Sequence, residues 1–183
     1  MQKLMQKLHP PEPKVTIKEV QEFLYKLEQG DILLSREAWH FTNYFIPGFW
    51  SHAAIFSGYD AIEAAGGGVQ TQEIMLWFLR KHNFCILRPT SYATPLEKML
   101  IVKFAEDQIG YDYDYIFGDT KTEKTWYCSE LVWKAWASID NHDGNWTDIF
   151  TRRETWGRTT VTPQDFYNAI TKGKLKIIYE HRD

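Results

Sequence analysis

The stretch Trp126–Trp136 constrains the fold most, because it predicts a buried helix that begins beside a cysteine. From Ser129 onward, apolar side chains recur at the spacing of one helical face. Cys128 therefore falls at or just before the first turn of this helix, where unpaired N–H groups and the helix dipole favour an anion. A thiolate is the anion that a cysteine can form, and it is also the nucleophilic state.

A second interpretation of Cys128 stays open at this point. Free cysteines are commonly buried as small apolar side chains. The carboxylate of Glu130 would also raise the pKa of a nearby thiol. A reactive Cys128 would need a histidine to outweigh that effect. Cys85, the other cysteine, lies in the middle of an apolar strand and is predicted to belong to the core.

The composition is that of an ordinary globular protein. The chain has 183 residues, of which 44% are hydrophobic, so it is long enough for one domain with a substantial core. The net charge is −3 and the Lys and Arg residues are scattered, so no nucleic-acid-binding surface is expected. Two cysteines do not indicate a disulfide framework. Aromatic residues reach 16%, an excess that either lines a cleft or fills a core.

The sequence predicts neither a membrane-spanning segment nor a signal peptide at its start. No apolar stretch approaches ~18 residues, so no transmembrane segment is expected. The first residues lack the apolar centre of a signal peptide, so the chain as given is expected to be cytoplasmic, although a signal removed beforehand would leave the same sequence. Residues 1–14 carry three prolines and are predicted to form a flexible leader, and residues 15–183 a single domain.

Periodicity and capping residues predict an α+β fold. Strands are expected at 31–35, 51–56, 61–65, 84–88 and 174–179, and helices at 16–30, 73–81, 94–110 and from 129 and 162 onward. The buried face of the helix at 94–110 is predicted to comprise Leu96, Met99, Leu100, Phe104 and Ile109. The aromatic segment Trp39–Trp50 fits neither period, so it is either a loop over a binding cleft or part of the core.

No cofactor or metal site is predicted. Gly66–Gly68 is not followed by the Lys-Ser/Thr pair of a phosphate loop, and is better explained as a flexible turn. Asp112, Asp114 and Glu123 match the first, third and twelfth positions of a calcium loop, but Ile116 and Phe117 occupy the positions that need an oxygen ligand and a glycine. The paired Cys/His spacings of a zinc site are absent from the sequence.

The strands at 51–56 and 61–65 are predicted to form a hairpin that brings a histidine beside a carboxylate. With Gly58 and Tyr59 as a two-residue loop, Ala54 faces Glu63. Glu63 is then the diagonal neighbour of His52 on the same face, at roughly 7–8 Å between backbones and within reach of its side chain. A register shift of one residue would separate them.

These residues together suggest nucleophilic catalysis. Cys128, His52 and Glu63 supply a thiol, a base and a group that orients the base. In this scheme His52 takes the thiol proton and later protonates the leaving group, while Glu63 accepts the N–H of the imidazole. The backbone N–H of Cys128 would help to hold the oxyanion. The alternative is that His52 is only a hydrogen-bonded strand residue.

Several segments carry a resemblance to a known family, in this order: Gly30–Leu34, Ser51–Phe56, Ile62–Ala64, Gly110–Tyr113, Tyr127–Val132 and Thr162–Pro163. Over about residues 29–170 the chain resembles the permuted NlpC/P60 papain-like enzymes of the YiiX/YebB type, relatives of lecithin retinol acyltransferase. In papain and ordinary NlpC/P60 proteins the cysteine precedes the histidine, whereas here His52 precedes Cys128, as in the permuted branch. The resemblance implies an antiparallel β-sheet or barrel packed against helices, with the cysteine at a helix start and the histidine on a strand.

The predicted activity is that of a cysteine hydrolase, an amidase or peptidase acting through a thioester acyl-enzyme. Its substrate would be a cell-wall-type peptide or an N-acyl compound. The alternatives are a lipid-directed thioesterase or acyltransferase, for which the aromatic segment would hold an acyl chain, and a non-catalytic binding module with the same cleft. The expected partner is therefore a small peptide or an acyl or lipid substrate, and the sequence indicates no oligomeric state.

Overall fold

A six-stranded antiparallel sheet forms the centre of the protein. The computed structural model describes residues 15–37, 46–90, 93–116, 124–139, 153–155 and 158–183. The sheet consists of β1 (Ile32–Arg36), β2 (His52–Phe56), β3 (Asp60–Ala65), β4 (Gly68–Glu73), β5 (Asn83–Pro89) and β10 (Leu175–His181). Their order is β10-β5-β1-β2-β3-β4, and every neighbouring pair is antiparallel. The predicted α+β class with an antiparallel sheet is confirmed.

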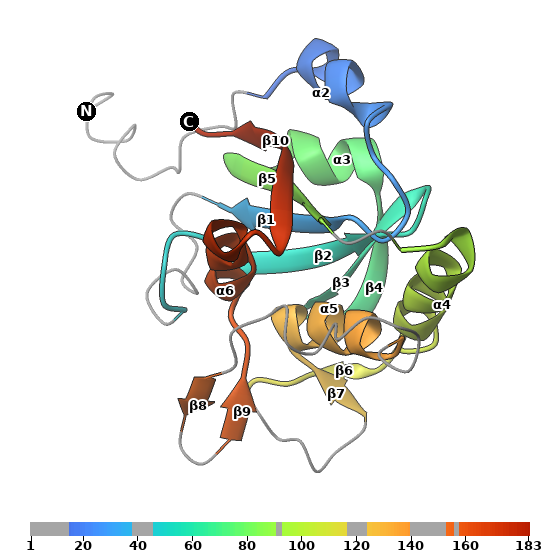
Figure 1. Cartoon of the computed structure of the whole chain (residues 1–183), viewed down its shortest axis with the longest axis vertical. Coiled ribbons are helices and arrows are strands. Elements are labelled where there is room, and N and C mark those ends of the chain that lie inside the picture. Colours follow the sequence, from blue (N-terminus) through green and yellow to red (C-terminus); the bar gives the residue numbers. More distant parts are fainter. Residues whose placement is uncertain (1–14, 38–45, 91–92, 117–123, 140–152, 156–157) are drawn as a thin grey trace, which may run out of the picture.

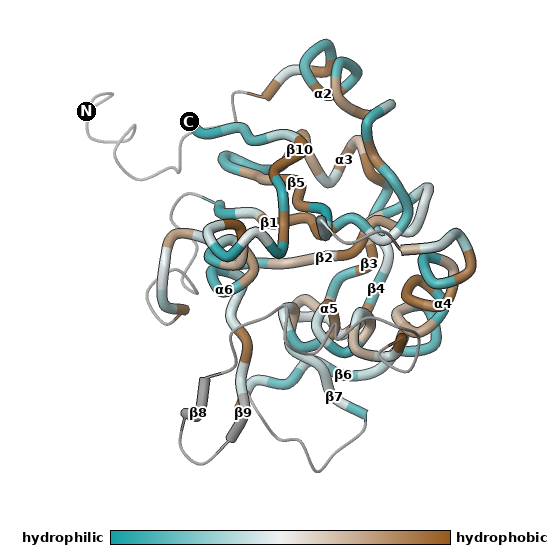
Figure 2. The backbone as a smooth tube through the Cα atoms, in the orientation of Figure 1, coloured by the Kyte–Doolittle hydropathy of each residue, from teal (hydrophilic) through white to brown (hydrophobic). Residues whose placement is uncertain are grey.

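Helices cover both faces of this sheet, as Figure 1 shows. On one face lie α2 (Ile17–Leu24) and α3 (Ile74–Leu79), and on the other lie α4 (Pro95–Glu106), α5 (Cys128–Ala137) and α6 (Pro163–Asn168). Because side chains alternate along a strand, Leu33 packs with α2 and α3 whereas Leu34 packs with α5. Figure 2 shows the hydrophobic residues gathered along the central strands. Within the described ranges, no helix is long and apolar enough to cross a membrane.

Shorter elements border the sheet. Strands β6 (Asp112–Tyr113) and β7 (Thr125–Trp126) form a parallel pair just before α5, and β8 (Arg153–Thr155) and β9 (Arg158–Thr160) form an antiparallel pair before α6. The 3₁₀ helix η3 (Ala169–Lys172) connects α6 to β10. The predicted leader at 1–14 and the first part of the aromatic segment, Trp39–Phe45, lie outside the described residues.

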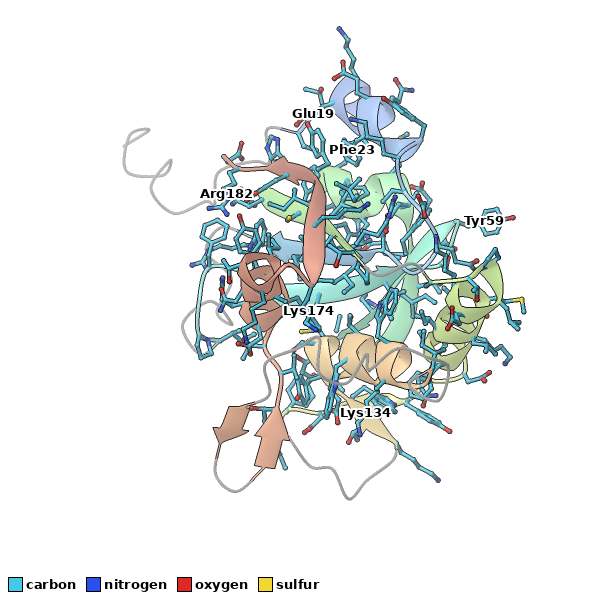
Figure 3. All side chains as sticks on the ribbon, in the orientation of Figure 1. Glu19, Phe23, Tyr59, Lys134, Lys174 and Arg182 are labelled. Carbon is cyan, nitrogen blue, oxygen red and sulfur yellow. The ribbon has the colours of Figure 1, made fainter. Side chains whose placement is uncertain are left out.

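The β2–β3 hairpin has the predicted register. Ile55 pairs with Ile62 and Phe56 with Ala61, and the backbone N–H of Ser57 donates to the carbonyl of Asp60 at 2.8 Å. The Ser57 hydroxyl accepts from the N–H of Asp60 at 2.9 Å, which stabilises the turn. Tyr59 projects from its tip (Figure 3). This register places Glu63 opposite Ala54, on the same face as His52.

The first predicted helix is too long. Thr16 caps α2 as expected, with its hydroxyl accepting from the N–H of Glu19 at 3.2 Å. The helix ends at Leu24, however, and not at Gly30. Gly30 instead adopts φ +89° in the turn before β1, and its N–H donates to the carbonyl of Phe56 at 2.9 Å. This bond ties the turn to the hairpin.

The predicted buried face of the helix at 94–110 is wrong except at Phe104, which packs against Trp126 with 5.9 Å between ring centroids. The capping box of Thr94 and Glu97 is present, but Leu96 and Met99 are more than half exposed and Leu100 and Ile109 are also exposed. The residues that α4 buries are Ile101, Val102 and Ala105. Figure 2 shows hydrophilic and hydrophobic residues mixed along α4. Apolar side chains lie on more than one side of this helix, and only one side meets the sheet and α5.

The strand β4 follows directly from the glycine turn and was not predicted. Gly68 adopts φ +100°, a conformation that side chains rarely allow. A Cβ at this position would lie 2.4 Å from the carbonyl oxygen of Tyr111. This close approach lets the N–H of Val69 donate to the Tyr111 carbonyl at 2.8 Å. The glycine therefore brings the loop before β6 against the edge of the sheet.

The last strand, β10, is fastened to the first helix. The Tyr179 hydroxyl donates to Glu19 at 2.9 Å, and His181 Nδ1 lies 2.6 Å from the same carboxylate oxygen. The ring of Tyr179 stacks on Phe23 with 4.4 Å between centroids. Figure 3 shows Glu19 and Phe23 on α2 near the end of β10. These contacts hold α2 against the end of β10, on the sheet face that also carries α3.

Candidate active site

Cys128 is the first residue of α5, as predicted, and its surroundings fix it firmly. The side chain is buried, with 2% of the residue exposed. The Ser129 hydroxyl donates to the carbonyl of Val161 at 2.7 Å, and the Tyr127 hydroxyl accepts from the N–H of Val161 at 3.3 Å. Both neighbours of the cysteine are thus held by Val161, which lies between β9 and α6. The start of α5 also packs against β2, which carries His52.

His52 lies between the thiol and a carboxylate. It is the first residue of β2, and its Nε2 lies 2.7 Å from Glu63 Oε2. Its side chain also forms a hydrogen bond with Cys128. Because Nε2 is taken by Glu63, Nδ1 is the ring nitrogen left for the sulfur. The structure therefore brings together all three residues that the sequence singled out.

The pKa shifts of these groups favour a thiolate–imidazolium pair. Burial alone would lower the pKa of His52, but its hydrogen bonds to Cys128 and Glu63 and their charges raise it from 6.5 to about 9. Burial alone would raise the pKa of Cys128, but the hydrogen bond and charge of His52 outweigh it and lower that pKa below its usual value. The concern that burial and Glu130 would keep the thiol protonated is thus outweighed by His52.

Glu63 stays ionised although it is buried. Burial by itself would raise its pKa, but the hydrogen bond and charge of His52, the charge of Lys81 and the hydrogen bond of Trp77 bring it down to about 2. A carboxylate can only accept hydrogen bonds, so the Nε2 of His52 must carry the proton that joins them. This fixes the imidazole with Nδ1 facing the thiol, which is the arrangement that a general base requires.

Backbone N–H groups surround the sulfur. Those of Ala53, on β2, and of Ser129, on the first turn of α5, donate to Cys128 and lower its pKa further. The N–H groups of a helix start stabilise negative charge. The backbone of Cys128 belongs to the same turn, so it is placed to hold an oxyanion, as the sequence suggested.

Two aromatic residues at the site were missed by sequence reasoning. Tyr113 lies near Cys128, and burial, followed by the charge of the thiolate, raises the pKa of its phenol, so it remains a hydrogen-bond donor. Its place in the segment Gly110–Tyr113, which resembles the family motif, was the available signal. Trp77 donates its indole N–H to Glu63 Oε2 at 2.8 Å. Nothing in the sequence distinguishes it from a core tryptophan.

The other sequence-based expectations can be placed as well. Cys85 is fully buried in β5 and burial raises the pKa of its thiol, in agreement with a core role. In the described part of the aromatic segment, Trp50 is fully buried and packs edge-on against Phe49 at 4.9 Å. The Arg182 guanidinium lies over both rings, 4.7 Å from the centre of Phe49 and 5.4 Å from that of Trp50. These two residues therefore belong to the packed body of the protein.

Comparison with known proteins identifies the family. A model of the permuted papain-like amidase enzymes of the YaeF/YiiX type, C92 family, matches residues 26–179. The chain belongs to this family. Among solved structures, the metalloprotein yiiX from Escherichia coli O157:H7 is similar with a TM-score of 0.70 and 16% sequence identity, over 85% of this chain and 98% of that one. Among curated protein sequences, none matches the chain.

Membership of the C92 family establishes a papain-like amidase and confirms the predicted cysteine-hydrolase class. The similarity to yiiX establishes the fold. The yiiX protein is a metalloprotein. Across the described ranges of the present chain, no group of three or more His, Cys, Asp or Glu side chains is placed to hold a metal ion.

Proposed function

We propose that this C92-family amidase uses Cys128 as its nucleophile, His52 as general base and acid, and Glu63 as the group that orients His52. The observation that carries the proposal is the position of His52, which is hydrogen-bonded to the sulfur on one side and to a buried carboxylate on the other. A structural histidine would need neither a lowered thiol pKa nor an ionised buried partner. The combination favours the ion pair on which papain-like catalysis depends.

The reaction follows from these positions. The Cys128 thiolate attacks the carbonyl carbon of the substrate amide, and the carbonyl oxygen takes the negative charge. The His52 imidazolium gives its proton to the leaving nitrogen, the C–N bond breaks, and the amine departs from a thioester. Water then attacks the thioester while His52 accepts its proton. The C–S bond breaks, which releases the carboxylic acid and restores the thiolate–imidazolium pair.

Stabilisation of the oxyanion is assigned to the backbone N–H of Cys128 and to the hydroxyl of Tyr113. The first belongs to the opening turn of α5, where N–H groups lack intrahelical partners. The second is a phenol whose raised pKa keeps it protonated beside the thiolate. Two donors aimed at one developing charge are the usual requirement of acyl transfer.

The substrate class is proposed from the same features. We favour a peptide of cell-wall type or an N-acyl compound, because the amidase family cleaves a C–N bond. A lipid-directed thioesterase or acyltransferase is the second candidate, and only the aromatic composition of Trp39–Trp50 favours it, since Phe49 and Trp50 pack into the body of the protein. The two candidates differ in the nucleophile that attacks the thioester intermediate and in the acyl group that the substrate transfers to the cysteine.

The test is a matched pair of cysteine variants. Cys128→Ser should abolish turnover of a panel of peptide and N-acyl anilides and of acyl thioesters, while circular dichroism and the melting temperature stay close to those of the unmodified protein. Cys85→Ser should retain turnover, because Cys85 lies in the core. Mass spectrometry of the quenched reaction should find the acyl group on the Cys128 peptide. Activity that survives in Cys128→Ser would refute the assignment of the nucleophile.

A further inference from the structure

We infer that Trp77 is a positioning residue for the active site, and that it acts by holding the carboxylate of Glu63 in the accepting state and geometry that His52 needs. The inference rests on the proposed function and extends it to a helix on the far side of the sheet from Cys128. It starts from one contact, the 2.8 Å hydrogen bond from Trp77 Nε1 to Glu63 Oε2.

Two donors meet on a single oxygen atom. Glu63 Oε2 accepts from His52 Nε2 at 2.7 Å and from Trp77 Nε1 at 2.8 Å. An indole N–H can donate but cannot accept, whereas an imidazole nitrogen can do either. Trp77 therefore presents Glu63 with a donor that cannot change its role, and the accepting state of Oε2 is favoured whatever His52 does. A carboxylate held in this way fixes the N–H tautomer of its histidine.

Burial makes this bond important. Glu63 is 4% exposed and Trp77 is fully buried, so no bulk water can replace a lost donor. A charged carboxylate in such surroundings needs hydrogen bonds to remain ionised. The Lys81 ammonium lies 5.1 Å from the centre of the Trp77 ring and lowers the pKa of Glu63 through its charge. Lys81 is itself buried and paired with Glu37 at 2.6 Å.

The local fold explains how Trp77 reaches the carboxylate. Glu63 of β3 pairs with Gln70 of β4, and β4 runs directly into α3. The Glu73 side chain caps α3 by accepting from the N–H groups of Met75 and Leu76, each at 2.9 Å. The capped helix turns back over the sheet face that carries Glu63, and Trp77 lies on its buried side.

The site is thus divided between the two faces of the sheet. Cys128 is presented by α5 on one face, and Glu63 is held by α3 on the other. His52, at the first residue of β2, contacts both. The imidazole is therefore positioned from both faces, by α5 through Cys128 and by α3 through Glu63.

The experiment compares Trp77→Phe, which removes the N–H but keeps an aromatic ring, with Trp136→Phe. Trp136 is a buried tryptophan on the last turns of α5 that packs against Gly30. The readout is the rate constant for alkylation of Cys128 by iodoacetamide at pH 6, followed by mass spectrometry. We expect Trp77→Phe to slow alkylation by about tenfold, as for a lost hydrogen bond to a charged group. Trp136→Phe should leave the rate within about twofold, since its N–H is not part of the site.

A double-mutant cycle separates positioning from packing. In a Glu63→Ala background, Trp77→Phe should cause no further loss beyond about twofold, because the group through which Trp77 acts is gone. An equal loss with and without Glu63 would show that Trp77 only supports the core, and would overturn the inference. So would a Trp77→Phe rate equal to that of Trp136→Phe.

A second readout does not depend on the folding of Trp77→Phe. In the otherwise unmodified protein, Glu63→Gln replaces the charged acceptor by a neutral one, so the assigned indole N–H resonance of Trp77 should move upfield. An unmoved resonance would overturn the inference. Failure of the proposed function looks different, because Cys128 would then be as inert as Cys85 in the unmodified protein.

Discussion

Replacement of His52 by alanine gives the sharpest test of the thiolate–imidazolium pair, and its size can be derived from the structure. Raising the pKa of His52 from 6.5 to about 9 corresponds to about 3 kcal/mol in favour of the imidazolium. The neighbouring anions, Cys128 and Glu63, supply this effect and also offset the burial that opposes it. Cys128 and Glu63 share this effect, so the thiolate contributes on the order of 1–2 kcal/mol.

This coupling is reciprocal. If the thiolate stabilises the imidazolium by about 1–2 kcal/mol, the imidazolium stabilises the thiolate equally, which is roughly fivefold to thirtyfold in thiolate population. The thiolate left in His52→Ala is more basic and hence more nucleophilic, which returns about twofold to fivefold. Alkylation of Cys128 by iodoacetamide at pH 6 should therefore fall by about threefold to sixfold in the variant.

The pKa shifts also predict in which direction alkylation and turnover change with pH. The pKa of Cys128 is lowered in the folded protein, so its alkylation should rise with pH below the usual thiol value of 9.0, and in His52→Ala this rise should move to higher pH. Above about pH 9 His52 loses its proton. Amide turnover should then fall because no imidazolium is left to protonate the leaving nitrogen. Alkylation, which needs only the thiolate, should persist.

The assay is mass spectrometry of the two cysteine peptides after timed alkylation between pH 5 and pH 10. Cys85 serves as an internal control within each sample, because burial raises the pKa of its thiol and it should react slowly in both proteins. The reasoning is refuted if Cys128 reacts at the same rate at pH 6 in both proteins, or if its pH profile follows that of Cys85.

Three further perturbations test separate parts of the molecule. Glu63→Gln should reduce turnover less than His52→Ala. It should also flatten the dependence of the melting temperature on pH between 4.5 and 2, because the lowered pKa of Glu63 gives stability that is present above pH 4.5 and lost as the pH falls to about 2. Tyr113→Phe should lower kcat about a hundredfold without slowing alkylation of the cysteine, if its hydroxyl meets the oxyanion and not the thiol. Arg88→Met should lower the free energy of unfolding by about 3 kcal/mol in urea titration, because it leaves unpaired the buried Asp31, whose carboxylate Arg88 contacts at 2.7 and 2.8 Å.

Local patterns in the sequence predicted the β2–β3 hairpin because its determinants are close together in the chain. The Ser57–Asp60 turn sets the register, and the two-residue period of the strands then decides which side chains share a face. His52 and Glu63, eleven positions apart, could therefore be placed together without any knowledge of the rest of the fold. The same holds for Cys128, whose helix start is visible in the apolar period that follows it.

Features that depend on packing could not be predicted in this way. The α4 sequence has apolar residues on two sides, and periodicity does not tell which side meets α5, so the exposed Leu96 and Met99 were assigned to the core. Strand β4 was missed because its polar residues follow a glycine turn, and its pairing with β3 appears only when the sheet is assembled. In the sequence, Trp77 cannot be distinguished from any other buried tryptophan. Its contact with Glu63 arises only because β4 and the start of α3 fold back over β3.

The division of the site between two layers also explains why the order of His52 and Cys128 along the chain can be reversed relative to papain. The thiol is positioned by contacts of the α5 start with Val161, and the imidazole by its place at the beginning of β2 and by Glu63. His52 and Cys128 are 76 positions apart in the sequence, and none of these contacts depends on that spacing or on which of the two residues comes first. What the chemistry requires is that a helix start and a strand start meet at one end of the sheet, with a carboxylate on the next strand. Any chain order that keeps these packed elements keeps the ion pair, because the pKa shifts come from burial and neighbouring charges and not from chain connectivity.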